Sequence, residues 1–181
     1  MKKLNLKTMA IVGIMTALTC VMGPFSIPLP FSPVPLSLTM LAIFFSLYVV
    51  GMKLGTLSTL LYLLIGLVGL PVFSNFSGGA GKLLGPTGGY LIGFIFMALI
   101  AGFFIDKWPN NLLLGFVGMV LGTAVCYAFG TAWLAYQNHL TLKAALLAAV
   151  IPFIPGDIIK MVIAVTLGPL VRKALKKAGL I

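Results

Sequence analysis

Long apolar runs, separated by short groups of proline, glycine and charged residues, dominate the chain. Most runs are close to the ~17–25 residues with which a helix crosses the hydrocarbon core of a bilayer. They lack the alternation of strands, and lipid accepts only helices or closed barrels as spanning structures. The pattern therefore predicts six membrane-spanning helices, at residues 8–22, 36–51, 53–70, 86–105, 112–134 and 156–175.

Residues 141–155 are the exception to this pattern. The apolar stretch 143–151 is stopped by Pro152 and Pro155 before it is long enough to cross. We expect a short re-entrant or surface helix there. No internal repeat is found, and we interpret residues 1–181 as a single membrane domain.

Composition supports the membrane interpretation. Hydrophobic residues make up 61% of the chain and charged residues 8%, and the mean hydropathy is +1.19. A soluble domain of this composition could not cover its surface with polar groups. The expected fold class is an all-α, polytopic integral membrane protein.

The positive charges predict an orientation. Only Lys82 and Lys143 fall on one side of a six-span arrangement, and the other side carries Lys2, Lys3, Lys7, Lys53, Lys107, Arg172, Lys173, Lys176 and Lys177. Because Lys and Arg favour the cytoplasmic side, both termini are expected in the cytoplasm. Orientation and contact with lipid headgroups explain the basic C-terminal segment, so nucleic acid is not an expected partner.

The N-terminus "MKKLNLKTMAIVGIMTALTC" resembles a signal peptide, with Cys20 at the place of a lipoprotein site. Leu18 and Thr19 match a cleavage site poorly, however, and we expect an uncleaved first helix. Cys20 and Cys126 both fall in spans and are expected to be unpaired thiols. With His139 as the single histidine and two carboxylates in the chain, no metal site is expected.

Catalytic patterns are missing from the sequence. The segment "SGGAGK" (77–82) resembles a phosphate-binding loop, but Phe76 and Leu83 replace its first glycine and its hydroxyl residue. No nucleophile with a base, no paired carboxylates and no metal cluster is recognisable. The sequence therefore predicts a binding or transport protein without a cofactor, not an enzyme.

Asp157 and Lys160 are the candidate site. A charge at membrane depth is costly unless it is paired or hydrated, and these two residues share one face of the last helix. One alternative is that Asp157 only caps the helix that starts after Pro155 and pairs with Lys160. The other is that the pair binds a small amphiphile with an acid group and an amide-like head.

Two further polar residues are expected on the same outer side. Asn75 lies in the glycine-rich link after the third span, and Tyr90 begins the fourth. Each has a structural alternative, since asparagine favours turns and tyrosine favours the membrane interface.

Three segments of the chain resemble a known family. They are "IPLPFSPVPLSL" (27–38), "LIGLVGLPVFSNFSGGAGKLLGPTGGYLIGF" (64–94) and "IPGDIIKMVIA" (154–164). Together, and in this order, they are similar to the BioY family, the biotin-specific substrate-binding subunits of energy-coupling factor (ECF) transporters.

This resemblance implies a six-helix subunit of the prokaryotic cell membrane that captures biotin from outside and delivers it across. A transmembrane coupling subunit and two ATPase subunits would be its partners, and the latter would hydrolyse the ATP. The family's polar biotin contacts would fall on Asn75, Asp157 and Lys160, with Tyr90 and the pair Gly88 and Gly89 shaping the pocket. Which residue meets the ureido ring and which meets the valerate carboxylate stays open.

One position departs from the family pattern. The family usually has a glutamine in the second helix where this chain has Thr39, so any contact of that glutamine is in doubt. The proline-rich link 23–35 is either a lid or wall over an outward-facing pocket or a rigid connector.

A small-residue face on the first helix, formed by Ala10, Gly13 and Ala17, either docks the coupling subunit, as in related subunits, or packs internally. The competing function is a stand-alone, proton-coupled carrier of a small carboxylate that uses Asp157. No inverted repeat or pair of broken helices supports it.

Overall fold

A computed structural model describes residues 6–30, 32 and 34–180; Lys2, Lys3 and Pro33, which the sequence analysis invoked, lie outside them. The described residues form seven α-helices, one 3-10 helix and two short strands. The order is α1 (Leu6–Met22), β1 (Ser26–Ile27), β2 (Leu36–Ser37), α2 (Thr39–Leu67), η1 (Ser74–Phe76), α3 (Ala80–Leu84), α4 (Gly88–Lys107), α5 (Leu112–Gln137), α6 (Leu142–Ala149) and α7 (Ile154–Lys177). The predicted all-α class is confirmed.

Four helices, α2, α4, α5 and α7, are long and apolar enough to cross a membrane, and α1 is a shorter apolar helix. The predicted spans 8–22, 86–105, 112–134 and 156–175 each coincide with one helix. The eight-residue α6 is the short helix expected between residues 141 and 155. Its N-terminus is capped by Thr141, whose side chain accepts a hydrogen bond from the amide of Ala144.

The predicted spans 36–51 and 53–70 correspond to the two halves of α2, which is interrupted at Gly51. Each prediction is three residues too long at its outer end, because Leu36 and Ser37 form β2 and the helix ends at Leu67. Gly51 adopts φ 80° and ψ 176°, a conformation that side chains disfavour. A Cβ atom on Gly55 would lie 3.1 Å from the Cα of Leu47, although eight residues of straight helix separate Cα atoms by about 12 Å. The chain therefore reverses at Gly51. The two halves are roughly 18 and 24 Å long at 1.5 Å per residue.

The reversal exposes backbone groups, and Asp106 at the end of α4 satisfies one of them. Its Oδ2 accepts a hydrogen bond of 2.8 Å from the amide of Met52, the first residue after the break. This carboxylate acts as a cap for the second half of α2.

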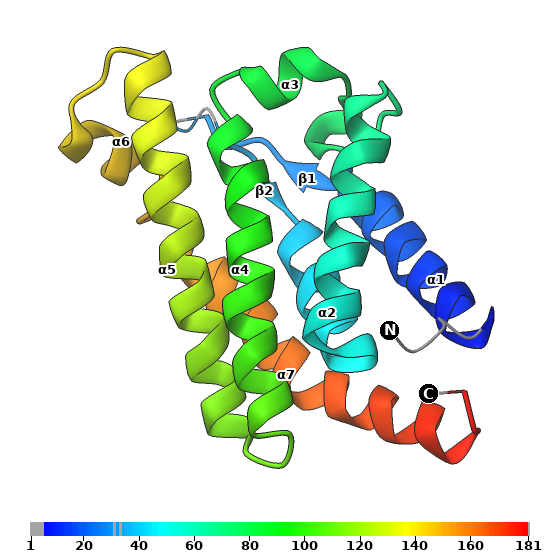
Figure 1. Ribbon diagram of the computed structural model, residues 1–181. Helices are drawn as coiled ribbons and strands as arrows, with labels where there is room; N and C mark the ends of the chain where they lie inside the picture. The colour runs from blue at the N-terminus through cyan, green and yellow to red at the C-terminus, as the bar shows by residue number, and fades with distance from the viewer. Residues whose placement is uncertain (1–5, 31, 33, 181) are drawn as a thin grey trace.

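The helices form one bundle with α2 in a central position (Figure 1). α2 packs against α1, α4 and α7, and α4 packs along α5. The main core cluster combines residues of α2, α4, α5, α6 and α7, with Tyr62, Phe44 and Phe73 among its largest fully buried side chains.

Small residues bring α4 and α5 close together. A Cβ atom on Gly93 of α4 would lie 3.0 Å from the Cα of Cys126, and one on Gly118 of α5 would lie 2.3 Å from the Cβ of Phe104. Since lipid tails are as apolar as leucine, helices in a membrane associate through close packing rather than by expulsion of water. These glycines make the α4–α5 contact possible.

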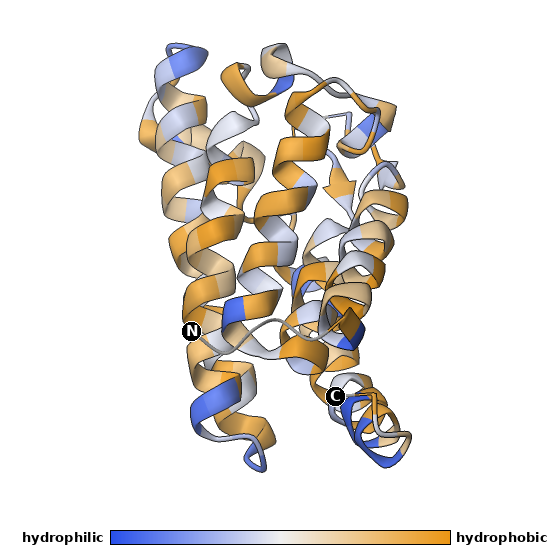
Figure 2. Ribbon diagram, turned by 45° about the vertical axis from the view of Figure 1, so that its right-hand side comes forward, coloured by the Kyte–Doolittle hydropathy of each residue, from blue (hydrophilic) through white to orange (hydrophobic). Residues whose placement is uncertain are grey.

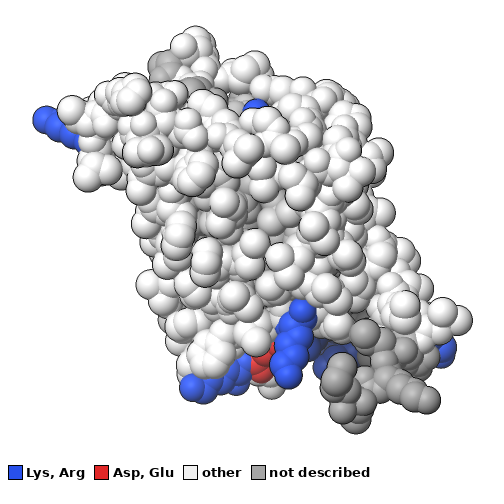
Figure 3. Space-filling model, turned by 45° about the horizontal axis from the view of Figure 1, so that its top comes forward, with Lys and Arg blue, Asp and Glu red and all other residues white. Residues whose placement is uncertain are grey.

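Polar residues concentrate at the two ends of the bundle. Figure 2 shows apolar helix surfaces between polar ends, and in Figure 3 most of the Lys and Arg side chains gather at one end. The start of α1 and the end of α7 meet there, because Val171 and Leu175 pack with Ile11 and Met15. The two ends of the described chain therefore lie on the same side of the bundle, and their cytoplasmic placement stays a prediction.

Two short antiparallel strands were not predicted from the sequence, β1 within the proline-rich link and β2 directly after it. Ser26 pairs with Ser37 and Ile27 with Leu36. Each strand has two residues, which is too short to show the alternation of apolar and polar residues that predicts a strand. The strand pair closes the link over the start of α2 (Figure 1).

The packing of α4 on α5 yields a first prediction. A Gly118→Ala change would press a methyl group onto Phe104 and is expected to lower the free energy of unfolding by about 1–3 kcal/mol, as overpacking typically does. Thermal unfolding in detergent measures the effect.

Gly13→Ala is the matched control, because a Cβ atom at Gly13 meets nothing within 4 Å. It should leave the protein equally stable or slightly more stable, since alanine favours helix. Equal losses in both variants would contradict the close-packing argument.

Candidate functional site

The first turn of α7 holds the buried ion pair. α7 begins at Ile154 with Pro155 in its first turn, and the amide of Asp157 donates to the carbonyl of Phe153. The Asp157 carboxylate thus lies where the helix dipole favours a negative charge. Lys160 follows one turn later, and its Nζ lies 2.8 Å from Oδ1 of Asp157. Asp157 is 3% exposed and Lys160 7% exposed, so the pair predicted from the sequence is formed inside the protein.

A third side chain completes this cluster. The hydroxyl of Tyr127, on α5, donates a hydrogen bond to Oδ2 of Asp157. Both carboxylate oxygens therefore have a partner, and the charges of Asp157 and Lys160 cancel. Tyr127 was not predicted from the sequence, because it is one of three hydroxyl residues in the predicted span 112–134, with Thr123 and Thr131, and no local pattern sets it apart.

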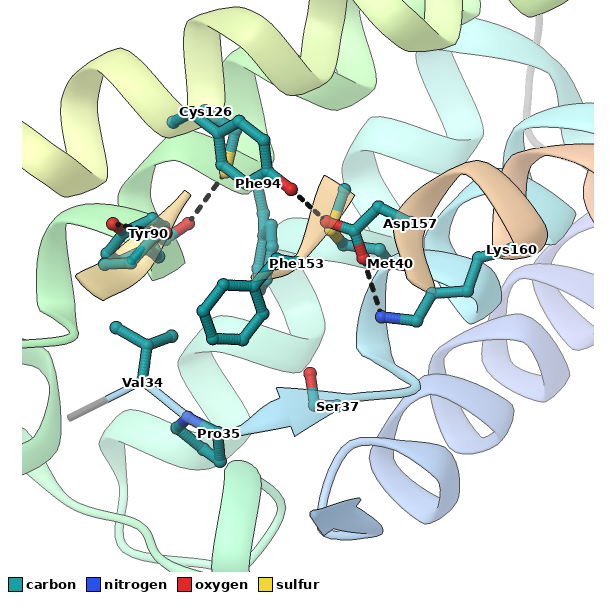
Figure 4. A pocket seen from close by; sticks show the side chains of 12 residues that line it. Val34, Pro35, Ser37, Met40, Tyr90, Phe94, Cys126, Phe153, Asp157 and Lys160 are labelled. Atoms are coloured by element: carbon teal, nitrogen blue, oxygen red, sulfur yellow. Dashed lines mark hydrogen bonds and ion pairs between the residues drawn. The ribbon is translucent and has the colours of Figure 1, made fainter. Parts of the chain in front are cut away.

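A cavity of about 50 Å³ borders this cluster. Figure 4 shows side chains from the link, from α2, α4 and α5, and from α7 converging on it. Its lining consists of Val34, Pro35, Ser37, Met40, Tyr90, Phe94, Cys126, Tyr127, Ala149, Phe153, Asp157 and Lys160. Most of this surface is apolar, and the ion pair with Tyr127 supplies a compact polar group.

A second cavity of about 40 Å³ adjoins the first and shares Val34, Pro35, Ser37, Tyr90 and Phe94 with it. Its other lining residues include the polar side chains of Thr39, Tyr62, Ser74 and Thr87. Tyr62 is fully buried and its hydroxyl has no hydrogen-bond partner. Both spaces are small beside the ~300–1,000 Å³ of typical ligand pockets. A ligand that occupied both would have to move the residues between them.

Tyr90 lies in the wall between the two cavities, as expected for a residue that shapes the pocket. Its hydroxyl donates to the carbonyl of Ala149 at 3.2 Å and lies 3.3 Å from the hydroxyl of Thr131. Its ring fits against Gly130, where a Cβ atom would lie 2.2 Å from the ring. Tyr90 is therefore a buried residue that lines both cavities rather than an interfacial anchor, and its part in ligand binding stays a prediction.

Gly88 and Gly89 do not line either cavity. A Cβ atom on Gly88 would lie 1.7 Å from the carbonyl oxygen of Leu83, and one on Gly89 would lie 2.3 Å from the Cβ of Trp133. The pair lets the start of α4 approach α3 and α5. Its effect on the pocket is indirect, through the position of Tyr90.

Asn75 is exposed and lies apart from both linings. It has φ 59°, and its Oδ1 accepts a hydrogen bond of 2.7 Å from the hydroxyl of Ser26. The backbone N–H of Asn75 donates to the same hydroxyl at 2.9 Å. In this structure Asn75 ties η1 to β1, as the turn alternative expects, and a ligand contact stays a prediction.

The link and Thr39 also take defined places. Val34 and Pro35 line both cavities, so this part of the link is a wall of the pocket. Thr39 is buried and accepts a hydrogen bond of 3.1 Å from the hydroxyl of Ser37. At position 39 the chain therefore offers a ligand only the hydroxyl of Thr39, which lines the second cavity.

Several pocket residues carried no recognisable sequence signal. Phe94, Phe153 and Met40 are apolar residues in apolar helices, and Cys126 was interpreted as a packing thiol. Only the meeting of distant elements turns such residues into a pocket wall.

Comparison with known proteins decides the family. The model of the BioY family matches residues 1–177. The chain belongs to the BioY family. The three segments that carried the resemblance, with Asp157, Lys160 and Tyr90, thus lie in a match that covers almost the whole chain.

Individual relatives agree with the family assignment. "Biotin transporter BioY" of Thermotoga maritima is 41% identical over 161 residues, which cover 89% of this chain and 93% of the relative. A BioY biotin transporter of Lactococcus lactis is 33% identical over 184 residues, covering 97% and 94% of the two chains.

A solved structure has the same fold. It is the crystal structure of the S-component for biotin from an ECF-type ABC transporter, with a TM-score of 0.87 and 32% sequence identity. The match covers 96% of this chain and 94% of that chain. The fold of this BioY family member is therefore that of an S-component.

The buried ion pair yields a second prediction. A Lys160→Met change leaves the Asp157 carboxylate buried without its cation and is expected to cost about 3–5 kcal/mol of unfolding free energy. The double change Asp157→Asn with Lys160→Met removes both charges and keeps an acceptor for Tyr127, so it should be more stable than the single variant. Thermal unfolding in detergent compares them.

Tyr127→Phe serves as a further comparison, because it removes only the hydrogen bond to Asp157. We expect a loss smaller than that of Lys160→Met. A double variant no more stable than Lys160→Met would show that the unpaired charge is not the cause of the loss.

Proposed function

We propose that this protein is the substrate-binding subunit of an ECF transporter, which captures biotin outside the cell and passes it across the membrane. The observation that carries the proposal is the buried Asp157 and Lys160 pair at a cavity, in a chain of the BioY family. The relatives named above are biotin transporters, and the fold is that of a biotin S-component. A stand-alone carrier of a small carboxylate is not favoured by these relationships.

The charge state of the pair suits the ureido ring of biotin. Asp157 and Lys160 neutralise one another, so the cluster offers a donor beside an acceptor but little net charge. A cyclic urea has the complementary groups, an N–H for the aspartate and a carbonyl oxygen for the lysine. A carboxylate would have to compete with Asp157 for Lys160. We therefore assign the ureido ring to the ion pair.

The rest of the pocket suits the apolar part of the vitamin. Phe94, Phe153 and Met40 provide an apolar surface for the sulfur-containing ring and the valerate chain. The second cavity, with hydroxyls of Ser74 and Thr87, would then receive the far end of the molecule.

Calorimetric titration of biotin into the detergent-purified protein tests this proposal and is the third prediction. We expect binding without added ions or nucleotide. Asp157→Asn and Tyr127→Phe should each weaken binding, Asp157→Asn by at least about tenfold, equivalent to ~1.4 kcal/mol. Biotin methyl ester should bind nearly as well as biotin, because the ureido ring meets the charged pair.

Four results would contradict parts of the proposal. Absence of biotin binding by the folded protein would remove biotin as the ligand. Equal binding by the original and the folded Asp157→Asn variant would leave the pair with a structural role only. A tenfold loss on esterification, comparable to that of Asp157→Asn, would place the carboxylate at Lys160 instead. Transport driven by a pH gradient in protein-only vesicles would favour the carrier alternative.

The proposed partners are a transmembrane coupling subunit and two ATPase subunits. Ala10, Gly13 and Ala17 on α1 are exposed, and the space beside Gly13 is empty to 4 Å. This small-residue face is therefore not used for packing within the described chain, which supports docking over internal packing. Small residues let another helix approach closely.

The proposed site of action is the prokaryotic cell membrane, with six spans and both termini in the cytoplasm. The two halves of α2 would count as separate spans, and α6 would stay on the outer side with Lys143. The concentration of Lys and Arg at the end where α1 begins supports this orientation (Figure 3).

A Gly13→Leu change is the fourth prediction. We expect it to lower co-purification with co-expressed ECF coupling and ATPase subunits, because the bulky side chain blocks helix approach, while biotin binding stays unchanged. Ala128→Leu, at an exposed position of α5, is the matched control. Equal co-purification of both variants would place the docking surface elsewhere.

A further inference from the structure

A cavity of about 290 Å³ lies at the basic end of the bundle, apart from the candidate biotin site. It is lined by Tyr48, Pro109, Asn110, Pro169, Arg172, Lys173 and Lys176, none of which lines either cavity of that site. Pro169 lies within α7, where proline kinks a helix. In Figure 1 the C-terminal part of α7 runs across the end of the bundle.

The charges in this cavity do not balance. Three cationic side chains line it, and Asp106 is the one carboxylate in ion-pair contact with any of them among the described residues. The distance from Asp106 to Nη1 of Arg172 is 3.8 Å, and Asp106 also accepts a hydrogen bond from the backbone amide of Met52. Lys173 and Lys176 have no carboxylate partner within the described part of the chain. The cavity therefore favours an anion.

Two buried donors at the cavity lack acceptors. Tyr48 is 4% exposed, and its hydroxyl has no hydrogen-bond partner. Nε of Arg172 is also buried without a partner. Tyr48 is held firmly, since Cβ atoms on Gly115 and Gly168 would lie 2.6 Å from its hydroxyl and ring. Because buried polar groups are normally hydrogen-bonded, these donors point to an acceptor that comes from outside the chain.

The surroundings indicate what kind of anion would bind. A neighbouring cavity of about 230 Å³ is also lined by Arg172 and Lys176. The rest of its wall is largely apolar and is formed by Ile11, Val49, Val50 and Leu54. Close to the end of α4, Lys107 lies 4.7 Å from the ring centre of Trp108, and such pairs of residues are common at the membrane interface. An anionic group next to an apolar surface at this depth is the chemistry of a phospholipid.

We propose that Arg172, Lys173 and Lys176, with the hydroxyl of Tyr48, bind the phosphate of one anionic phospholipid, whose acyl chain lies against Ile11 and Val49. The guanidinium group and the tyrosine hydroxyl donate to phosphate oxygens, and the lysines supply charge. This is a defined site, in contrast to the diffuse attraction of basic segments to an acidic membrane surface.

Native mass spectrometry of the detergent-purified protein tests the proposal, and this is the fifth prediction. With phosphatidylglycerol and phosphatidylcholine of identical acyl chains, we expect one phosphatidylglycerol to be retained preferentially. Lys173→Gln with Lys176→Gln should lower its affinity about tenfold, and Tyr48→Phe should lower it measurably.

Lys53→Gln with Lys107→Gln is the matched control. It removes the same charge from the same end of the molecule, and neither residue lines the cavity. We expect it to retain the lipid. Thermal unfolding checks that all variants are folded.

Several outcomes would overturn the proposal. An equal loss in the two double variants would indicate diffuse attraction rather than a site. Displacement of the lipid by millimolar inorganic phosphate or glycerol phosphate would make free phosphate the ligand. If phosphatidylglycerol is not preferred over phosphatidylcholine, the basic side chains of the cavity bind another partner, such as an acidic protein surface.

Discussion

Hydrocarbon offers no hydrogen bonds, and this constraint governs the whole structure. A polar group inside the membrane is costly unless it finds a partner within the protein. Long helices satisfy their own backbones, and α2 reverses at the basic end of the bundle, where the Asp106 carboxylate accepts a hydrogen bond from the Met52 amide. The same rule explains why Asp157 has a partner for each of its oxygens, Lys160 for one and Tyr127 for the other. The polar part of the candidate biotin site thus consists of groups that would each be costly to bury in the membrane without the others.

The lipid environment also governs how the helices pack. Without expulsion of water as a driving force, the helices depend on close approach, and glycines provide it. Gly130 makes room for the ring of Tyr90, and Gly89 brings α4 against Trp133. Tyr90 then stands between the two cavities of the site. The shape of the pocket therefore depends on glycines that never touch it.

Helix α7 links the two sites. Its first turn carries Asp157 and Lys160, and beyond Pro169 it carries Arg172, Lys173 and Lys176. The first cluster is neutral and closed, whereas the second has an excess of positive charge and unpartnered donors. The contrast suits a neutral ureido ring at one end and an anion at the other.

The sequence by itself determined the apolar environment, the fold class, the limits of most helices and the shared helix face of Asp157 and Lys160. These follow from local features: the length of apolar runs, the positions of proline and glycine, and charges in an apolar context. Tertiary structure alone decided that Tyr127 completes the ion pair, that Phe153 and Phe94 become pocket walls, and that Asn75 bonds to Ser26 instead of lining the cavity. It also placed Tyr48 beside the basic end of α7. These contacts join residues from different helices, and their geometry depends on how closely the helices approach, which no local pattern records.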